Sequence, residues 1–503
     1  MKMKIILALL ISWFMIGTAM AKSGNVDNGT EVYNKRCVWC HGEEGDGMGP
    51  GADRMNPPPR DFTSGMYKIN TTGFDDMVPN DEDIYRMIAD GMPNTNMPGW
   101  SDILSEQDMW DLVAYLKTFA GYEEEKPETQ VDFGKQIPSS EDSLKKGAEL
   151  FKDRCSECHG DAGKGVAIKK LKDDLGYRTW PRNLTKPWTF RGSNDPKDIY
   201  ARISTGIPGT QMPNFANEKS KKKLSIEERW HVANYAASLA EKEKIVRGES
   251  TVIKAEKIEG DLPDAPGDER WATTASTTFY LLPQIIGKER FFTPSNDTIT
   301  ARAVYNDKDI VFLLEWDDRT KSTPGNADAE NISDPGISED SVALQFPVRL
   351  LETSEKPYFG MGDAVNPVNI WQWKGGTTDT AESVILLNSK GFAEIEKRDA
   401  AEVGLTAKGV YDNGTWRVVM KRSLVAADEE KDLSIELGKF IPVAFAAWDG
   451  SNGEKGSKHT MSTWYWLYLK PASGTDVYVV PLVVFALILG GLIWWARSAA
   501  KGK

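Results

Sequence analysis

The sequence predicts a multidomain protein: two all-α domains of one repeated type, then an antiparallel β-sandwich, then one C-terminal transmembrane helix. Three observations predict this architecture. Two segments in the first half of the chain repeat each other, including a short cysteine motif. The second half contains apolar and alternating runs around turn residues, which is the pattern of β-hairpins. Close to the C-terminus lies an uncharged apolar stretch that is long enough to cross a bilayer.

The N-terminus has the pattern of a secretory signal peptide. The basic start MKMK is followed by the apolar run IILALLISWFMIG and by TAMA, an A-x-A-like site, so we expect cleavage after Ala21. An uncleaved N-terminal anchor is the alternative. The formal net charge of −13 argues against nucleic acid as a partner, because nucleic acid requires a basic face.

Residues 477–496 predict a membrane-spanning helix, since about 20 apolar residues cross the bilayer core. Trp494 and Trp495 fit an interfacial aromatic belt, and Arg497 and the lysines after it fit the positive charge found on the inner side of membranes. We therefore expect a single-pass protein of the cell membrane, with its folded domains on the periplasmic, extracytoplasmic side.

The four cysteines form two C-x-x-C-H motifs, CVWCH at 37–41 and CSECH at 155–159. This is the attachment pattern of c-type haem, in which two thiols form thioethers and the adjacent histidine is the proximal iron ligand. A thioredoxin-like redox pair or half a zinc site is the alternative for one such motif. Two motifs that use every cysteine of an exported chain favour two covalent haems c. The predicted attachment and ligand residues are Cys37, Cys40 and His41, and Cys155, Cys158 and His159.

The surroundings of the two motifs repeat as well. DIYRMIADGMPNTNMPGW (83–100) aligns with DIYARISTGIPGTQMPNF (198–215), and PPRDF (58–62) aligns with WPRNL (180–184). LSEQDMWDLVAYLKTF aligns with LSIEERWHVANYAASL, and both have the apolar spacing of an amphipathic helix. These segments resemble tandem class I cytochrome c domains.

The repeat also predicts the sixth iron ligands. Met212 is the one methionine between the second haem motif and residue 248, and its counterpart in the first copy is Met97. Methionine opposite histidine raises the reduction potential of a haem, so both haems are expected to be high-potential carriers. Arg60 and Arg182 share one repeat position and could each pair with a haem propionate, or be solvated. His231 aligns with Asp111 and is therefore interpreted as an ordinary helix residue.

The third domain is predicted as an antiparallel β-sandwich from two hairpin patterns, residues 298–318 and 406–424. Three segments follow in the order SVALQFP, PYFGMGDAVNPVNIWQWK and WDGSNGEKGSKHTMSTWYWLYL. With them, residues 260–469 resemble the haem b subunit of ethylbenzene dehydrogenase and its relatives. These relatives are the gamma subunits of exported type II molybdoenzymes in the dimethyl sulfoxide reductase superfamily.

The resemblance implies a b-type haem in the sandwich, with methionine and lysine as axial ligands. The matching positions are Met361 in FGMGD and Lys458 in GSKHTMSTW. A non-covalent haem needs no cysteine, and methionine is a usual iron ligand. The alternatives are that Met361 fills a gap in the core, that Lys458 is a solvated loop residue, and that His459 is the second ligand.

The sequence motifs contain no assembled catalytic site, so a non-catalytic electron-transfer subunit is expected. The resemblance implies partners with a molybdenum catalytic subunit and an iron–sulfur subunit, and electron exchange with a respiratory-chain carrier. The fused cytochromes and the anchor are most similar to the gamma subunit of membrane-associated nitrite oxidoreductase. A carbohydrate-binding sandwich with appended cytochromes is the alternative function, and a dihaem peroxidase is a third.

The predicted boundaries are as follows: signal peptide 1–21, first cytochrome c domain 22–122, linker 123–143, second cytochrome c domain 144–243, linker 244–259, β-sandwich haem b domain 260–472, transmembrane helix 477–496 and cytoplasmic tail 497–503.

Overall fold

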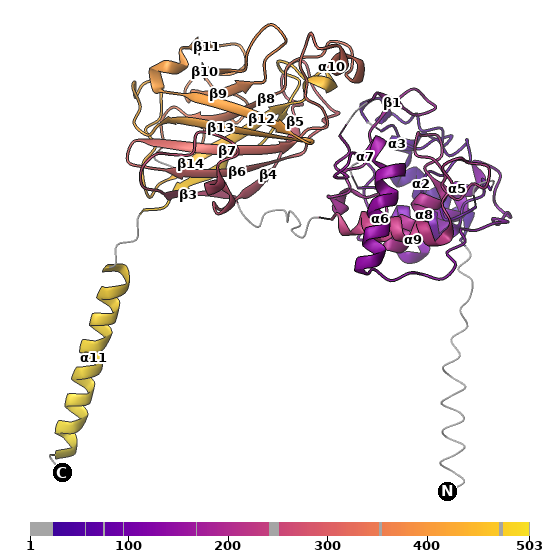
Figure 1. Cartoon of the computed structure of the whole chain (residues 1–503), viewed down its shortest axis with the longest axis horizontal. Coiled ribbons are helices and arrows are strands. Elements are labelled where there is room, and N and C mark those ends of the chain that lie inside the picture. The colour runs from indigo at the N-terminus through magenta and orange to yellow at the C-terminus, as the bar shows by residue number, and fades with distance from the viewer. Residues whose placement is uncertain are drawn as a thin grey trace. The chain divides into compact units, whose positions relative to one another are not determined.

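The computed structural model describes residues 24–55, 57–73, 76–93, 95–166, 169–240, 251–351, 355–471 and 476–501. The predicted signal peptide, residues 1–21, lies outside these described residues. The chain divides into two compact units, Met1–Lys244 and Ile245–Lys503 (Figure 1). The predicted order of a helical first half, a large sheet domain and a C-terminal apolar helix is confirmed.

The first unit contains two copies of one four-helix module. The first copy has α2 (Val26–Arg36), α3 (Val38–His41), α4 (Asp81–Asp90) and α5 (Glu106–Thr118). The second copy has α6 (Glu141–Arg154), α7 (Ser156–His159), α8 (Pro196–Thr205) and α9 (Ile226–Ser238). The second copy departs from the all-α expectation, because β1 (Leu171–Lys172) and β2 (Arg178–Thr179) form a short antiparallel hairpin.

The last helix of each module begins with the same kind of N-terminal cap. Ser105 and Asp108 form a capping box at the start of α5, and Ser225 and Glu228 form one at the start of α9. In such a box, side chains satisfy amide groups that the helix itself leaves without partners. The repeated sequence L-S-x-x-[DE] therefore begins the closing helix of both copies at the same position.

A glycine sets the helix crossing in each copy. A Cβ on Gly29 of α2 would lie 2.1 Å from the carbonyl oxygen of Asp111 in α5. A Cβ on Gly147 of α6 would lie 2.2 Å from the carbonyl oxygen of His231 in α9. The first and last helices of each module thus approach at backbone distance, and larger side chains do not fit there.

The segment predicted as the linker between the copies, 123–143, packs against both of them. Val131 N–H donates to the carbonyl of Thr71 in the first copy. Phe133 lies against the core of the second copy, and its carbonyl accepts a hydrogen bond of 2.8 Å from Trp230 Nε1. Helix α6 begins at Glu141, inside the predicted linker.

The second unit is a two-layer sandwich built from one hydrogen-bonded path of strands, β11-β10-β9-β8-β14-β16-β3-β6-β7-β13-β12. Three short strands lie off this path: β15 pairs with β14 and β5, and β4 pairs with β6. The strands are β3 (Val252–Lys257), β4 (Thr277–Tyr280), β5 (Leu282–Pro283), β6 (Thr298–Tyr305), β7 (Asp309–Asp317), β8 (Ser341–Pro347), β9 (Val368–Lys374), β10 (Ser383–Ser389), β11 (Ile395–Arg398), β12 (Thr406–Asp412), β13 (Thr415–Ser423), β14 (Phe440–Trp448), β15 (Thr460–Met461) and β16 (Tyr465–Leu469).

Most pairs are antiparallel, as predicted, but β3 runs parallel to both of its neighbours, β16 and β6. This strand lies at 252–257, within the predicted linker 244–259, so the sandwich begins before residue 260. It joins the two layers, because β16 continues to β14 on one side and β6 continues to β7 on the other.

The main core lies between the two layers. Alternate residues of β6, β7 and β13 face alternate residues of β8, β9 and β14, as the period of two in a strand requires. Trp316, Trp371, Trp373 and Trp416 are buried in this core. These four tryptophans of the sandwich are thus structural.

Helix α11 (Asp476–Lys501) matches the predicted membrane segment. Its part Pro481–Ser498 is long and apolar enough to cross a membrane.

Candidate haem-binding sites

Each C-x-x-C-H motif forms a single turn of helix directly after the first helix of its module. Cys37 ends α2 and begins α3, and the His41 amide donates to the Cys37 carbonyl at 2.9 Å. In the second copy, the His159 amide donates to the Cys155 carbonyl at 2.9 Å. One turn therefore brings both thiols and the histidine of each motif close together, which is the arrangement that attachment to one haem requires.

The histidines of the two motifs are held in the same way. His41 Nδ1 lies 3.0 Å from the carbonyl oxygen of Arg60, and His159 Nδ1 lies 3.0 Å from that of Arg182. Burial lowers the pKa of both histidines, so the neutral imidazole predominates. With Nδ1–H donated to a carbonyl, Nε2 keeps its lone pair for a metal, as in most histidine–metal sites.

The carbonyl groups of Arg60 and Arg182 are functional atoms that the sequence analysis missed, because it considered only their side chains. The repeated Pro-Arg dipeptide was the available signal, although it lies 19 residues after the histidine in one copy and 23 in the other. The Arg60 guanidinium is half-buried, and burial lowers its pKa while the carboxylates of Asp61 and Asp173 oppose this effect.

Cys37 and Cys155, the first cysteines of the two motifs, do not have the character of reactive thiolates. Burial, together with the second cysteine of each motif, raises the pKa of Cys37 and of Cys155 to about 12. A redox-active C-x-x-C pair depends instead on a lowered thiol pKa. The electrostatics of the motifs therefore favour haem attachment over the thioredoxin-like alternative.

Met97 and Met212 occupy the same turn in the two copies. The Met97 carbonyl accepts from the Met92 amide at 3.0 Å, and the Met212 carbonyl accepts from the Ile207 amide at 3.2 Å. A threonine Oγ1 two residues before each methionine accepts from its amide, at 3.1 Å in the first copy and 3.2 Å in the second. Met212 packs against the core cluster of its module, together with Cys155.

His231 is buried, and its Nδ1 lies 2.9 Å from Ser143 Oγ. At the aligned position, Asp111 Oδ1 accepts from the Asn25 amide at 2.7 Å. Both residues thus tie the closing helix to the start of the first helix. This agrees with the interpretation of His231 as a structural residue.

The two copies also contact each other directly. Arg86 of the first copy pairs with Asp198 of the second at 2.9 Å, and Lys68 pairs with Asp173 at 3.4 Å. Arg202 donates to the Lys68 carbonyl at 3.1 Å. These contacts fix the position of one module against the other.

In the sandwich, a second apolar cluster lies on the outer face of the layer that contains β8, β9 and β14. We call it the outer cluster. The main core uses the opposite face of the same strands. Trp464 donates to the Pro357 carbonyl at 2.7 Å, and Gln345 donates to the Phe359 carbonyl at 3.0 Å, so the loop before β9 is held over this face. The outer cluster consists of Ala343, Val368, Ile370, Ala444 and Trp464, with Phe359, Met361, Leu387, Ala446 and Trp448 packed against it.

Met361 has a backbone conformation that is rare for its residue type. Its φ is 68°, in the left-handed region, where residues other than glycine are disfavoured by about 1–2 kcal/mol. Its carbonyl accepts from the Gly391 amide at 2.8 Å and from Ser389 Oγ at 2.9 Å. Strain held in this way by neighbouring groups is typical of functional positions.

Lys458 and His459 are neighbours in the loop that follows Trp448 but differ in environment. Lys458 is partly exposed, and its Nζ pairs with Glu289 Oε2 at 3.0 Å. His459 is buried, its Nδ1 lies 3.1 Å from the Gly456 carbonyl, and burial lowers its pKa to about 4. Its ring packs against the Trp448 ring in a tilted arrangement, with centroids 4.6 Å apart.

Trp448 therefore joins the two predicted ligand regions. It packs in the outer cluster with Met361, its ring lies against that of His459, and its Nε1 donates to the Gly456 carbonyl at 3.0 Å. The sequence analysis did not single out this tryptophan, because at strand spacing it could not be told from the core tryptophans.

Comparison with known proteins assigns both halves of the chain. A family model described as ethylbenzene dehydrogenase matches residues 268–394 and 384–460. A cytochrome c model matches residues 26–120 and 144–240, one match for each repeat.

Two curated relatives match this chain over most of their own length. The chain is 30% identical over 205 residues to the ORF7 protein of Haloferax mediterranei, named as a respiratory nitrate reductase haem subunit; the match spans 41% of this chain and 68% of the relative. It is 27% identical over 217 residues to chlorate reductase subunit gamma of Ideonella dechloratans, over 43% of this chain and 83% of the relative.

Among solved structures, a reducing HAO-like protein complex of Kuenenia stuttgartiensis contains a chain that is 40% identical. The match covers 44% of this chain and 98% of that chain, with a TM-score of 0.40.

Proposed function

We propose that this chain, which belongs to the family of haem-carrying gamma subunits of molybdoenzymes and has two cytochrome c domains fused to it, holds two haems c and one haem b. Family membership makes it an electron-transfer subunit. Each haem supplies a reversible one-electron change at its iron. The observation that carries the proposal is the combination of two equally built C-x-x-C-H turns with a sandwich of this family.

In the cytochrome domains, the proposed ligand pairs are His41 with Met97 and His159 with Met212. The carbonyls of Arg60 and Arg182 would hold the histidine rings and increase their basicity. Two observations support the methionines: they occupy equivalent turns, and those turns are closed by equivalent hydrogen bonds. Six-coordinate irons suit electron transfer and disfavour a peroxidase.

In the sandwich, the proposed axial ligands of haem b are Met361 and Lys458. The outer cluster supports this site, because it is an apolar sheet face with Met361 packed against it, and a non-covalent haem requires an apolar surface. The strained backbone of Met361 supports its role as a ligand. The assignment of Lys458 as the second ligand rests on the order of motifs in the family. To bind the iron, Lys458 would have to break its ion pair with Glu289 and lose a proton.

The proposed partners are a molybdenum catalytic subunit, an iron–sulfur subunit and a carrier of the respiratory chain. The chain would carry electrons between that oxidoreductase and the respiratory chain, anchored by α11 with its haem domains on the periplasmic side. The specific complex we propose is nitrite oxidoreductase, because the relatives named above belong to nitrate and chlorate reductases and this chain adds cytochromes and an anchor. Family membership favours electron transfer over the carbohydrate-binding alternative.

The complex purified from native membranes in detergent tests the proposal. Acid–acetone extraction should release one haem b per chain and leave two covalent haems c, and molybdenum should co-purify. Addition of nitrite should reduce the c haems of the complex. A single covalent haem, or no extractable haem, would refute the cofactor assignment. If the haem and molybdenum contents are as expected but nitrite does not reduce the haems, only the choice of nitrite oxidoreductase is refuted.

Substitutions in one loop test the lysine. Lys458→Ala should remove haem b or leave an iron that binds carbon monoxide, whereas His459→Ala should have a much smaller effect. Lys455→Ala is the matched control, since Lys455 is an exposed lysine of the same loop. If His459→Ala empties the site and Lys458→Ala does not, the histidine is the ligand.

A further inference from the structure

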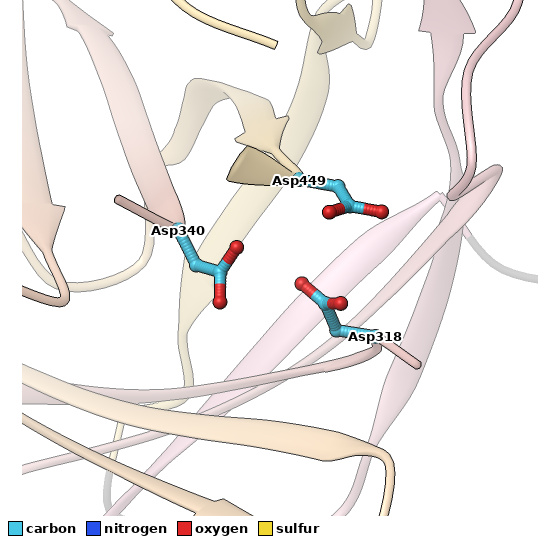
Figure 2. Close-up of side chains that lie close together, drawn as sticks. All are labelled: Asp318, Asp340 and Asp449. Atoms are coloured by element: carbon cyan, nitrogen blue, oxygen red, sulfur yellow. The ribbon is translucent and has the colours of Figure 1, made fainter. Parts of the chain in front are cut away.

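Three buried aspartates face one another at one end of the sandwich. One carboxylate oxygen from each of Asp318, Asp340 and Asp449 lies within 4.8 Å of the others. The three side chains point into a shared space (Figure 2). They are 4%, 0% and 5% exposed, so water does not screen their mutual repulsion.

The aspartates come from both layers. Asp318 follows β7, which pairs with β13 in one layer. Asp340 precedes β8 and Asp449 follows β14, and these two strands are neighbours in the other layer. Trp416 of β13 donates to Asp340 Oδ2 at 2.9 Å across the core. A group bound by all three carboxylates would therefore connect the two layers.

The hydrogen bonds to these carboxylates leave one buried oxygen, Asp318 Oδ2, without a partner among the described residues. Asp340 Oδ2 also accepts from the Ser322 amide at 2.7 Å, and its Oδ1 accepts from the Gly450 amide at 2.9 Å. Asp318 Oδ1 accepts from the Thr320 amide at 3.1 Å. Asp318 Oδ2 is buried and has no hydrogen-bond partner within the described part of the chain. This orphaned oxygen belongs to the carboxylate that points toward Asp340 and Asp449 (Figure 2).

Within the described part of the chain, no basic side chain forms an ion pair with these carboxylates. The ion pairs found among the described residues do not include any of the three aspartates. Three buried carboxylates that lack a counter-charge are strongly unfavourable when ionised, even though most of their oxygens accept hydrogen bonds. A bound cation would satisfy the orphaned oxygen and offset the charge in one step.

We propose that Asp318, Asp340 and Asp449 bind a Ca²⁺ ion that links the two layers of the sandwich. Carboxylate oxygens are hard ligands, which suit Ca²⁺ and Mg²⁺ rather than metals that prefer nitrogen or sulfur. Ca²⁺ fits better, because it accepts irregular, flexible coordination, whereas Mg²⁺ demands a near-ideal octahedron. The ligands here are fixed by strand ends and by their own amide hydrogen bonds.

The ion would also order the loop that carries Lys458. That loop begins at Asp449, whose amide donates to Glu454 Oε2 at 3.1 Å, and Glu454 is itself buried. Ser338, close to Asp340, donates to the Glu454 carbonyl at 2.6 Å. Loss of Ca²⁺ should therefore loosen the proposed haem b site. This consequence rests on the proposed function, whereas Ca²⁺ binding itself does not.

The full chain, purified in detergent with its haems, tests the site. Elemental analysis after gel filtration should find one calcium per chain. Treatment with EGTA should lower the thermal unfolding midpoint by about 5–10 °C, and about 1 mM CaCl₂ should restore it. The same concentration of MgCl₂ should restore much less. An unfolding midpoint that responds to neither EGTA nor CaCl₂ would overturn the proposal.

Asp318→Asn separates a cation site from three protonated acids. If Ca²⁺ binds, the variant should lose the CaCl₂-dependent rise in unfolding midpoint, while the exposed control Asp379→Asn keeps it. If no cation binds, removing one buried acid should raise the midpoint whether or not CaCl₂ is present, and that result would overturn the proposal. Haem b content measured in the same samples tests the link to Lys458 separately: its retention in EGTA would refute the link alone.

Discussion

Trp448 Nε1 donates to the Gly456 carbonyl at 3.0 Å, and this hydrogen bond connects the cluster around Met361 to the loop that carries Lys458. The proposed haem b site therefore depends on a side chain that is not itself a ligand. We expect Trp448→Ala to lower haem b content several-fold and to leave both haems c attached. Pigment extraction measures this. Trp466→Ala, which removes a half-buried tryptophan outside the outer cluster, should leave haem b in place. Equal losses in both variants would contradict a specific role of Trp448.

Met361 can be tested with two substitutions that differ only in backbone preference. Both Met361→Ala and Met361→Gly remove the thioether and should deplete haem b. Because the residue has a φ of 68°, glycine should be more stable than alanine there, by about 1 kcal/mol. Extraction measures the haem, and chemical unfolding measures the stability. Retention of haem b in both variants would exclude Met361 as a ligand.

The c-type ligands give a spectroscopic prediction. Met97→Ala and Met212→Ala should each retain both covalent haems, because the thioethers are untouched. Each should lose the methionine–iron absorption band of one haem, at the red end of the visible spectrum, and lower that haem's reduction potential. Redox titration followed by absorbance measures both effects. An unchanged spectrum of Met212→Ala would mean that another residue binds the iron.

The helix crossing of the second cytochrome domain predicts a stability effect. Gly147→Ala places a Cβ 2.2 Å from the His231 carbonyl oxygen, so α6 and α9 must separate. Forced repacking of this kind costs about 1–3 kcal/mol. Thermal unfolding should show a lower midpoint than in Glu149→Ala, an exposed position of the same helix. Equal midpoints would show that the crossing adjusts freely.

Membrane orientation is the fifth prediction. The positive residues after α11 are expected to be cytoplasmic, so protease added to spheroplasts should digest the haem domains and spare a short C-terminal fragment. An antibody to that fragment would detect it. Protection of the haem domains would mean the opposite orientation.

Much of the fold could be predicted from the sequence because it depends on local sequence patterns. The haem motifs, the L-S-x-x-[DE] helix starts and the hairpin turns each involve a few neighbouring residues. The parallel strand β3 could not be predicted, because its pairing with β16 joins residues 252–255 to 466–469. Only the tertiary fold decides such a pairing.

The sites divide in the same way. The covalent haem sites could be predicted from residue types, because the motif consists of cysteines and a histidine. The carbonyl that orients each histidine could not, because every residue has a backbone carbonyl. Asp318, Asp340 and Asp449 each follow or precede a strand, where aspartate is common in turns. The three aspartates lie close together only because the two layers of the sandwich pack against each other, and this packing could not be predicted from the sequence.

The ion pair between Arg86 and Asp198 also shows that the two copies have diverged at the surface they share. The contact joins equivalent helices, α4 and α8, but the first copy supplies the arginine and the second supplies the carboxylate. In the repeat alignment the position of Arg86 is Ala201 in the second copy, so the second copy has no cation at the equivalent position. The two cytochrome domains are therefore not interchangeable at the surface that joins them.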